Sequence, residues 1–156
     1  MSPTGIDVRV DVLGVKVSAI DMSEALTAFD SWIERGERTY VCVTGVHGVM
    51  ESQSDVALRE IHNHSGLTTP DGMPMVWCGR YAGAKGMQRV YGPDLMLEVC
   101  SLAAQRGWRM FFYGAAPGVP EELARKLGEL SPGLQVVGTF SPPYRELSTE
   151  EKAEIA

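Results

Sequence analysis

The stretch Gly66-Leu67-Thr68-Thr69-Pro70-Asp71-Gly72-Met73-Pro74 is the clearest structural signal in the chain. A short run that favours β structure ends at an acidic residue, and a glycine and a new apolar pattern follow it. Asp71 is therefore predicted at the carboxyl end of a strand, which is the edge of an open α/β sheet where ligands bind. A carboxylate at that edge can take a proton from a substrate. The alternative is that Asp71 only caps the helix that begins at Gly72.

The composition indicates one globular domain that does not bind nucleic acid. The 156 residues are 44% hydrophobic, and the 14 basic and 20 acidic residues give a net charge of −6 without a long block of like charge. No apolar run approaches the roughly 20 residues of a membrane span, and the first residues lack the features of a signal peptide. We therefore expect a soluble, cytoplasmic protein.

The three cysteines, Cys42, Cys78 and Cys100, are widely spaced and form no C-x-x-C motif. Each lies in an apolar element, so buried free thiols explain them better than disulfides or a zinc site.

The first elements have strong local signals. Residues 8–13 and 15–20 alternate apolar and polar side chains around Gly14, which predicts two short strands or a hairpin that forms an edge or lid. Asp21 and Glu24 have the spacing of a capping box, and the helix they begin should end at Gly36. The apolar run Thr39–Thr44 is predicted to be a central parallel strand.

The rest of the chain alternates helices and strands. Helices are predicted over residues 45–52, 55–63, 73–81, 93–107 and 119–130 and from the capping box at Ser148, and strands over residues 108–113 and 134–139. This order predicts an α/β fold, a Rossmann-like doubly wound, mostly parallel sheet with helices on both faces. Residues 1–156 would be a single domain with an N-terminal strand pair in 1–20. The last helix is too short to pack as a finished crossover, so we expect the domain to be incomplete at its C-terminus.

The turn from Gly114 to Gly118 follows one of the predicted strands and precedes a helix. That order can present free amide groups and the positive end of a helix dipole to a phosphate. The alternative is an ordinary turn between a strand and a helix. With Gly138 on the next strand, we expect this turn to form the nucleotide side of a cleft.

Histidines offer weaker candidates. His62 and His64 have an H-x-H spacing, but at the end of a helix this pattern is more typical of a solvated terminus than of a metal site. His47 lies in the turn just after Thr44, where a ligand would sit, or is only a polar loop residue. No G-x-S-x-G elbow and no Walker A loop is present, so nothing supports a hydrolase or an ATPase.

Thr44, Asp71 and the 114–118 turn form a constellation of strand ends, with Arg80 and Arg89 close in sequence. A base, a cation and amide donors on one sheet edge suit the displacement of a nucleoside diphosphate. Several stretches here resemble the WecG/TagA/CpsF glycosyltransferases in order and spacing. They are Thr44 at its strand end, Thr69–Pro74, Arg89-Val-Tyr-Gly-Pro-Asp94, Phe111–Gly114 with Pro117-Gly118-Val119, Pro132–Leu134 and Val137-Gly138 to Pro143.

The resemblance implies transfer of a sugar, typically N-acetylmannosamine, from its UDP derivative to a polyprenyl-diphosphate-linked sugar in cell-surface polysaccharide or teichoic acid linkage synthesis. It implies Asp71 as the general base, Thr44 as a substrate contact and Arg89 as a diphosphate partner, with Gly114, Pro117 and Gly138 on the donor side. The family usually has Asn where this chain has Val46, so we expect that contact to be missing or supplied by His47.

The same resemblance implies a single displacement that inverts the anomeric carbon. No cofactor is expected, and because no D-x-D motif is present, we expect the reaction to be independent of metal. The whole protein would act at the inner face of the plasma membrane, with peripheral membrane contact through a C-terminal part that is absent here, and an open sheet edge could pair with another copy.

Two other functions stay open on the sequence. One is a nucleotide-binding α/β module without catalysis. The other is an NAD-type oxidoreductase, which the absence of G-x-G-x-x-G and of an acidic residue about 20 positions beyond a glycine loop opposes.

Overall fold

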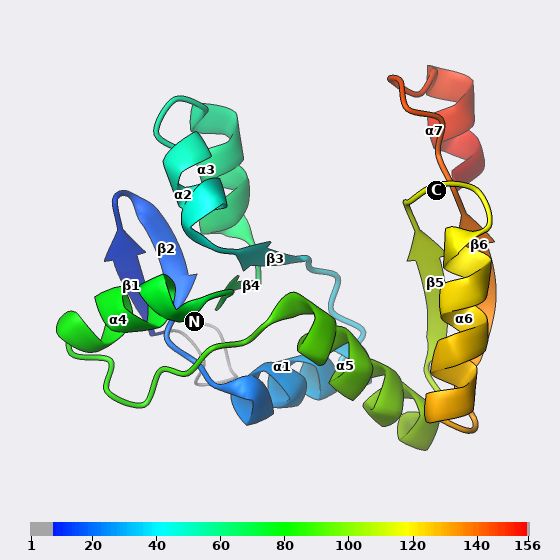
Figure 1. Cartoon of the computed structure of the whole chain (residues 1–156), viewed down its shortest axis with the longest axis horizontal. Coiled ribbons are helices and arrows are strands. Elements are labelled where there is room, and N and C mark those ends of the chain that lie inside the picture. The colour runs from blue at the N-terminus through cyan, green and yellow to red at the C-terminus, as the bar shows by residue number, and fades with distance from the viewer. Residues whose placement is uncertain (1–7, 156) are drawn as a thin grey trace. The chain divides into compact units, whose positions relative to one another are not determined.

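The computed structural model describes residues 8–155, so part of the predicted N-terminal strand pair lies outside the described residues. The chain divides into two compact units, residues 1–96 and 97–156. Each unit is described by itself, with the elements labelled as in Figure 1.

The first unit begins with an antiparallel hairpin of β1 (Arg9–Val12) and β2 (Val15–Ser18). Leu13 and Gly14 both have positive φ, at 53° and 85°, as a tight hairpin turn of the right twist requires. The hairpin is confirmed, but it is not a lid. Its valines are buried in one cluster, which comprises Val10, Val12, Val15, Val17, Val49, Met75 and Met87.

The remaining elements of the first unit follow the predicted order. They are α1 (Met22–Glu34), β3 (Val41–Thr44), α2 (Val46–Glu51), α3 (Val56–His64), β4 (Leu67–Pro70) and α4 (Met73–Tyr81). Asp21 caps α1 in the predicted capping box with Glu24. Strands β3 and β4 are parallel, with Thr44 opposite Pro70. Every residue of β4 is buried, whereas Val43 of β3 is 46% exposed, so β3 is less central within this unit than its sequence suggested.

Helix α5 (Gly92–Arg106) runs from the first unit into the second, which continues with β5 (Arg109–Tyr113), α6 (Val119–Leu130), β6 (Gln135–Phe140) and α7 (Thr149–Ile155). Strands β5 and β6 are parallel, with a register irregularity between Met110 and Phe111. Cys100, Phe112 and Leu127 form the buried core of this unit. The capping box predicted at Ser148 is present, because its Oγ and backbone N–H both bond with Glu151.

Each parallel pair is a β-α-β unit: α2 and α3 connect β3 to β4, and α6 connects β5 to β6. Within residues 8–155 the strands form one antiparallel and two parallel pairs, which confirms the α/β class. None of the helices described here combines the length and apolar character needed to cross a membrane.

The cysteines are free, as predicted, but they are not all buried. Burial raises the pKa of the Cys100 thiol in the second unit. Cys78 is exposed on α4, so the prediction of a buried thiol is wrong at this position. The outer face of α4 is apolar, and its sequence therefore looks like that of a core helix.

Candidate functional site

Asp71 lies directly after β4, at the carboxyl end of the strand, as predicted. Its backbone N–H donates to the carbonyl oxygen of Thr44 at 3.0 Å, which extends the pairing of β3 and β4 by one residue. The buried strand and this hydrogen bond hold the backbone of Asp71 in a defined position. A side chain on such a support loses little entropy when it meets a substrate.

The alternative that Asp71 only caps α4 is wrong. The residue at the cap position is Gly72, with φ at 114°, and no side chain makes a capping hydrogen bond to this helix. Asp55 shows what a cap looks like in this chain, since its carboxylate accepts from the backbone N–H of Leu58 at 2.9 Å. The Asp71 carboxylate is only partly buried, and we find no hydrogen bond or ion pair to it within residues 8–155.

Thr44, at the end of β3, is 1% exposed, and its side-chain Oγ1 has no hydrogen-bond partner among the described residues. A buried hydroxyl without a partner costs about 1–3 kcal/mol, so it needs an explanation. The backbone around it is tightly packed, because a Cβ on the next residue, Gly45, would lie 2.7 Å from the carbonyl oxygen of Asp71. The unpaired hydroxyl and the uncommitted carboxylate therefore belong to adjacent strand ends.

The loop that carries Arg89 passes beside this pair. The N–H of Val90 donates to the carbonyl oxygen of Pro70 at 3.0 Å. A Cβ on Gly92 would lie 3.2 Å from Val43 Cγ1, which is a tight approach, and 3.9 Å from Asp71 Oδ2, which is an ordinary contact. The absence of a side chain at Gly92 thus leaves room next to Asp71.

The two arginines that the sequence places near the site differ in their contacts. The Arg89 guanidinium lies 4.8 Å from the centre of the Tyr91 ring and 3.9 Å from the Asp94 carboxylate, and its side chain is about half exposed at 46%. Arg80 donates from Nε to the carbonyl oxygen of Met87 at 3.1 Å and so supports the loop. The Arg89 guanidinium is therefore oriented by its neighbours and accessible to a ligand, whereas the Arg80 side chain stabilises the loop.

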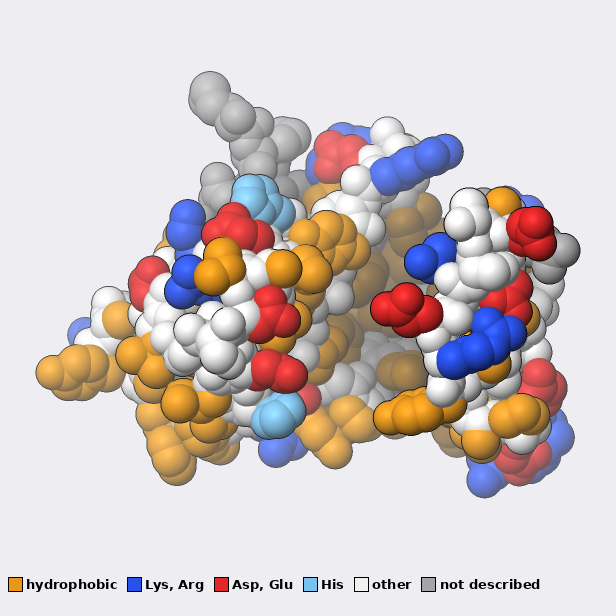
Figure 2. All heavy atoms as spheres, turned by 90° about the horizontal axis from the view of Figure 1, so that it is seen from above, with side chains coloured by type: hydrophobic (Ala, Val, Ile, Leu, Met, Phe, Trp, Pro, Cys, Tyr) orange, Lys and Arg blue, Asp and Glu red, His pale blue; other side chains and the backbone are white. Residues whose placement is uncertain are grey.

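His47 lies in the first turn of α2, with 95% of its side chain exposed, and its Nε2 is 3.5 Å from the Glu51 carboxylate. No contact joins it to Thr44 or Asp71 among the residues that the structure describes. The structure therefore gives no support to a substrate contact there, and that role stays a prediction. Histidine side chains are visible at the surface of this unit (Figure 2).

His62 is buried, contrary to the solvated position that the sequence predicted. It is 5% exposed, and its Nδ1 lies 2.9 Å from the carbonyl oxygen of Leu58 and 3.3 Å from Ser52 Oγ. The solvated helix end fits His64, which is exposed, but is wrong for His62. The described residues contain no group of three or more potential His, Cys, Asp or Glu ligands that could hold a metal ion.

In the second unit, the turn after β5 has an unusual backbone. Gly114, Ala115 and Gly118 have φ values of 118°, 61° and 89°, and the N–H of Gly114 donates to the carbonyl oxygen of Phe140 at 2.9 Å. The turn and the segment after β6 enclose a groove of about 710 Å³, lined by Ala115, Ala116, Pro117, Ser141, Pro142, Pro143 and Tyr144. The groove thus lies at the carboxyl ends of both parallel strands, where a ligand is expected.

The charges around this groove do not favour a phosphate. None of its lining residues is charged. The first turn of α6 carries Glu121 and Glu122, which offset the positive end of the helix dipole. The pKa of Glu122 is lowered to about 2, chiefly by its hydrogen bond with Arg125. The groove suits an uncharged, planar part of a ligand better than a diphosphate.

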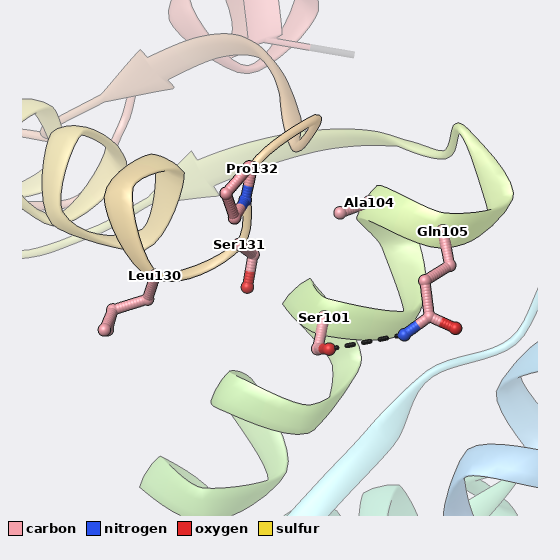
Figure 3. A pocket seen from close by; sticks show the side chains of 6 residues that line it. All are labelled: Ser101, Ala104, Gln105, Leu130, Ser131 and Pro132. Carbon is pink, nitrogen blue, oxygen red and sulfur yellow. Dashed lines mark hydrogen bonds between the residues drawn. The ribbon is translucent and has the colours of Figure 1, made fainter.

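Gly138 lies on β6 opposite Phe111, and a Cβ there would lie 2.6 Å from Cε2 of that ring. The glycine is therefore explained by packing within the strand pair, and its predicted contact with the donor stays a prediction. A second, smaller pocket of about 290 Å³ precedes the two strands and is lined by Ser101, Ala104, Gln105, Leu130, Ser131 and Pro132 (Figure 3). It too has no charged lining residue.

The chain is similar to known proteins of one family. The family model described as "Glycosyl transferase WecG/TagA/CpsF family" matches residues 10–156. A protein of Bacillus spizizenii strain W23 is 24% identical over 136 residues, which are 84% of this chain and 52% of that protein. A protein of Bacillus subtilis strain 168 is 26% identical over 97 residues, 62% of this chain and 38% of that protein. Both are named N-acetylglucosaminyldiphosphoundecaprenol N-acetyl-beta-D-mannosaminyltransferase, and the chain spans about half of their length or less.

Proposed function

Because the chain belongs to the glycosyl transferase WecG/TagA/CpsF family, we propose that the whole protein transfers N-acetylmannosamine from its UDP derivative to N-acetylglucosamine on a polyprenyl diphosphate. The names of the two relatives support this acceptor and this sugar. The product would serve cell-surface polysaccharide or teichoic acid linkage synthesis. As a protein that uses a lipid-borne acceptor and a nucleotide sugar, it would act at the inner face of the plasma membrane.

The observation that carries the proposal is the Asp71 carboxylate, which has no capping bond and lies on a buried strand end. Asp71 takes the proton from the acceptor hydroxyl as that oxygen forms a bond to the anomeric carbon. The bond from this carbon to the UDP oxygen breaks on the opposite face, and UDP leaves with its electron pair. The anomeric configuration is inverted, and the hydroxyl of Thr44, which has no partner within residues 8–155, supplies a polar contact to substrate.

Arg89 meets the charge of the leaving diphosphate. Tyr91 and Asp94 orient its guanidinium at 4.8 Å and 3.9 Å without enclosing it. A charge-assisted contact from Arg to phosphate oxygens strengthens as negative charge develops on the leaving group. The reaction needs no divalent cation in this scheme.

Taken by itself, the groove of the second unit has a lining that suits a nucleoside. Tyr144 and Pro117 offer flat surfaces for the base, and Ser141 offers a hydroxyl beside the glycine turn that begins at Gly114. The uncharged lining supports a nucleoside rather than the diphosphate. We assign the Rossmann-like arrangement of the sequence prediction to the whole enzyme, since each described β-α-β unit is the element that such a fold repeats.

The test is an assay of a longer chain with UDP-N-acetylmannosamine and a short-chain lipid diphosphate that carries N-acetylglucosamine. The expected result is a β-linked disaccharide product in the presence of a metal chelator. Calorimetric titration of the 156-residue chain with UDP, UDP-sugars and NAD accompanies it. Binding of UDP without any turnover by the longer chain would favour a nucleotide-binding module, and binding of NAD alone would favour an oxidoreductase.

A further inference from the structure

His62 is a buried ionisable residue that the proposed mechanism does not use. Its side chain lies near the end of α3 and is only 5% exposed. His64, on the same helix, makes an equivalent contact, from its Nδ1 to the carbonyl oxygen of Glu60 at 2.8 Å, yet its side chain is 74% exposed. Burial of a polar ring costs free energy unless its neighbours compensate. The position of His62 therefore needs an explanation beyond the geometry of its own helix.

The imidazole of His62 packs against the first turn of α2. Its Nδ1 donates to the carbonyl oxygen of Leu58 at 2.9 Å and lies 3.3 Å from Ser52 Oγ. The Ser52 hydroxyl donates in turn to the carbonyl oxygen of Gly48 at 2.7 Å. A Cβ on Gly48 would lie 3.6 Å from His62 Nε2 and 3.3 Å from Thr44 Cγ2. The edge of the ring and the methyl group of Thr44 therefore meet on the same side of Gly48.

The backbone of His62 contacts the other strand of the parallel pair. Its carbonyl oxygen accepts from Thr68 Oγ1 at 2.8 Å and from Ser65 Oγ at 2.7 Å. Thr68 is fully buried and belongs to β4, the strand that ends just before Asp71. His62 thus connects the end of β3 to β4, with its side chain on one strand and its backbone on the other.

Thr44 is the residue whose orientation depends on this connection. Its methyl group and its hydroxyl share one Cβ, so rotation about χ1 moves both together among three staggered positions. Because the methyl group lies toward Gly48, the hydroxyl can occupy only one of these positions. That hydroxyl has no hydrogen-bond partner within residues 8–155 that could hold it. The packing of the methyl group therefore fixes the direction of the hydroxyl.

We propose that His62 is a positioning residue, which acts through Gly48 to hold the Thr44 hydroxyl in the direction in which it meets substrate beside Asp71. The proposal rests on the proposed function for the contact between Thr44 and substrate, whereas the fixed rotamer does not depend on it. A group that is oriented before substrate binds loses less entropy in the reaction. The alternative is that His62 only stabilises the packing of α2 on α3.

The first experiment measures the χ1 rotamer of Thr44 in the 156-residue chain by NMR, from the three-bond couplings of its methyl carbon to the backbone nitrogen and carbonyl carbon. We expect one rotamer in the wild type and an average over rotamers in His62→Ala. Ser52→Ala should show a smaller change, and it keeps the test available if His62→Ala does not fold. His64→Ala is the matched control and should leave the couplings unchanged. Wild-type couplings in every folded variant of His62 and Ser52 would overturn the proposal.

The second experiment measures turnover of the longer chain. His62→Ala should lower kcat about ten-fold and change the KM for the donor by less than about two-fold, because the hydroxyl is misdirected and not removed. His64→Ala should change neither quantity. Thr44→Val keeps the shape of the side chain without its hydroxyl and should also lower kcat about ten-fold.

The double variant separates positioning from stability. If His62 acts through Thr44, adding His62→Ala to Thr44→Val should lower kcat by less than about a further two-fold. Fully additive losses would instead assign His62 a merely structural role. Wild-type turnover in Thr44→Val, together with averaged couplings in His62→Ala, would refute the substrate contact of the proposed function and still support the control of the rotamer by His62.

Discussion

Each unit contains a turn that connects a strand to a helix, and the two turns can be compared directly. The first joint, as we call these turns, is Asp71 and Gly72, which connect β4 to α4 in the first unit. The second joint is residues 114–118, which connect β5 to α6 in the second unit. Both helices follow a glycine with positive φ and have a proline in their first turn. The same backbone device therefore begins both helices.

The chemistry that the two joints present is different. Strand β4 is buried at all four residues and presents a single uncommitted carboxylate. Strand β5 buries only Phe112, and its turn opens into an uncharged groove followed by two acids. The comparison teaches that a glycine turn before a helix does not by itself make an anion site, because the nearby side chains decide which ligand it favours.

The largest effect is expected at the first joint. Asp71→Asn should lower the turnover of the whole protein by about 100-fold or more, since an amide cannot accept the proton of the acceptor hydroxyl. Folding stability should hardly change, because Asp71 makes no capping bond. Asp55→Ala is the control: it should cost about 1 kcal/mol of stability and leave turnover intact. Wild-type turnover in Asp71→Asn would remove Asp71 from catalysis.

Within the first unit, the two arginines near Asp71 should differ in their effect on UDP affinity. Arg89→Ala should weaken the affinity for UDP by about 10-fold or more, which corresponds to the loss of a charge-assisted contact. Arg80→Ala should leave the affinity unchanged and lower the stability by about 1 kcal/mol, because its bond to Met87 supports the loop. Calorimetry and thermal unfolding measure the two quantities. Equal effects of the two substitutions on UDP affinity would contradict the assignment.

The two glycines should differ in how much they tolerate a side chain. Gly72 has φ 114° and ψ 149°, which only glycine adopts readily, and Gly118 has φ 89° and ψ −21°, close to the left-handed helical region. In urea unfolding, the free energy of unfolding should fall by about 2 kcal/mol for Gly72→Ala and by about 1 kcal/mol for Gly118→Ala. Asn at position 118 should recover part of the loss. A larger loss at Gly118 would reverse the comparison.

The smallest effect is expected from an acid of the second joint. The pKa of Glu121 lies below its ordinary value, chiefly because Thr139 Oγ1 donates to its carboxylate. Its stabilising contribution is therefore complete above the ordinary pKa of 4.5 and is lost as the pH falls through the lower, folded value. As the pH falls from 6 to 3, the unfolding temperature of the wild type should fall slightly more steeply than that of Thr139→Val. If the two unfolding temperatures fall in parallel, this hydrogen bond adds nothing to stability.

The sequence predicted the elements well because their signals are local. The bounds of α4 and α6 agree with the predicted ranges 73–81 and 119–130, where glycine and proline mark the first turn. Both capping boxes form as expected. The position of Asp71 at a strand end followed from the same cues. Such signals involve residues only a few positions apart, so they can be recognised without knowledge of the tertiary contacts.

Burial and partners were decided only by the tertiary structure. His62 is buried because Ser52 and the carbonyl oxygen of Leu58 meet its ring, and the hydroxyl of Thr44 is left without a partner by the packing of β3 and β4. The difference between Arg80 and Arg89 depends on which backbone and ring each meets after the loop has folded back. Sequence alone thus determined where helices and strands begin and which side chains stand at their ends. Whether each of those side chains has a hydrogen-bond or ion-pair partner depends on contacts between residues distant in the chain, which only folding brings together.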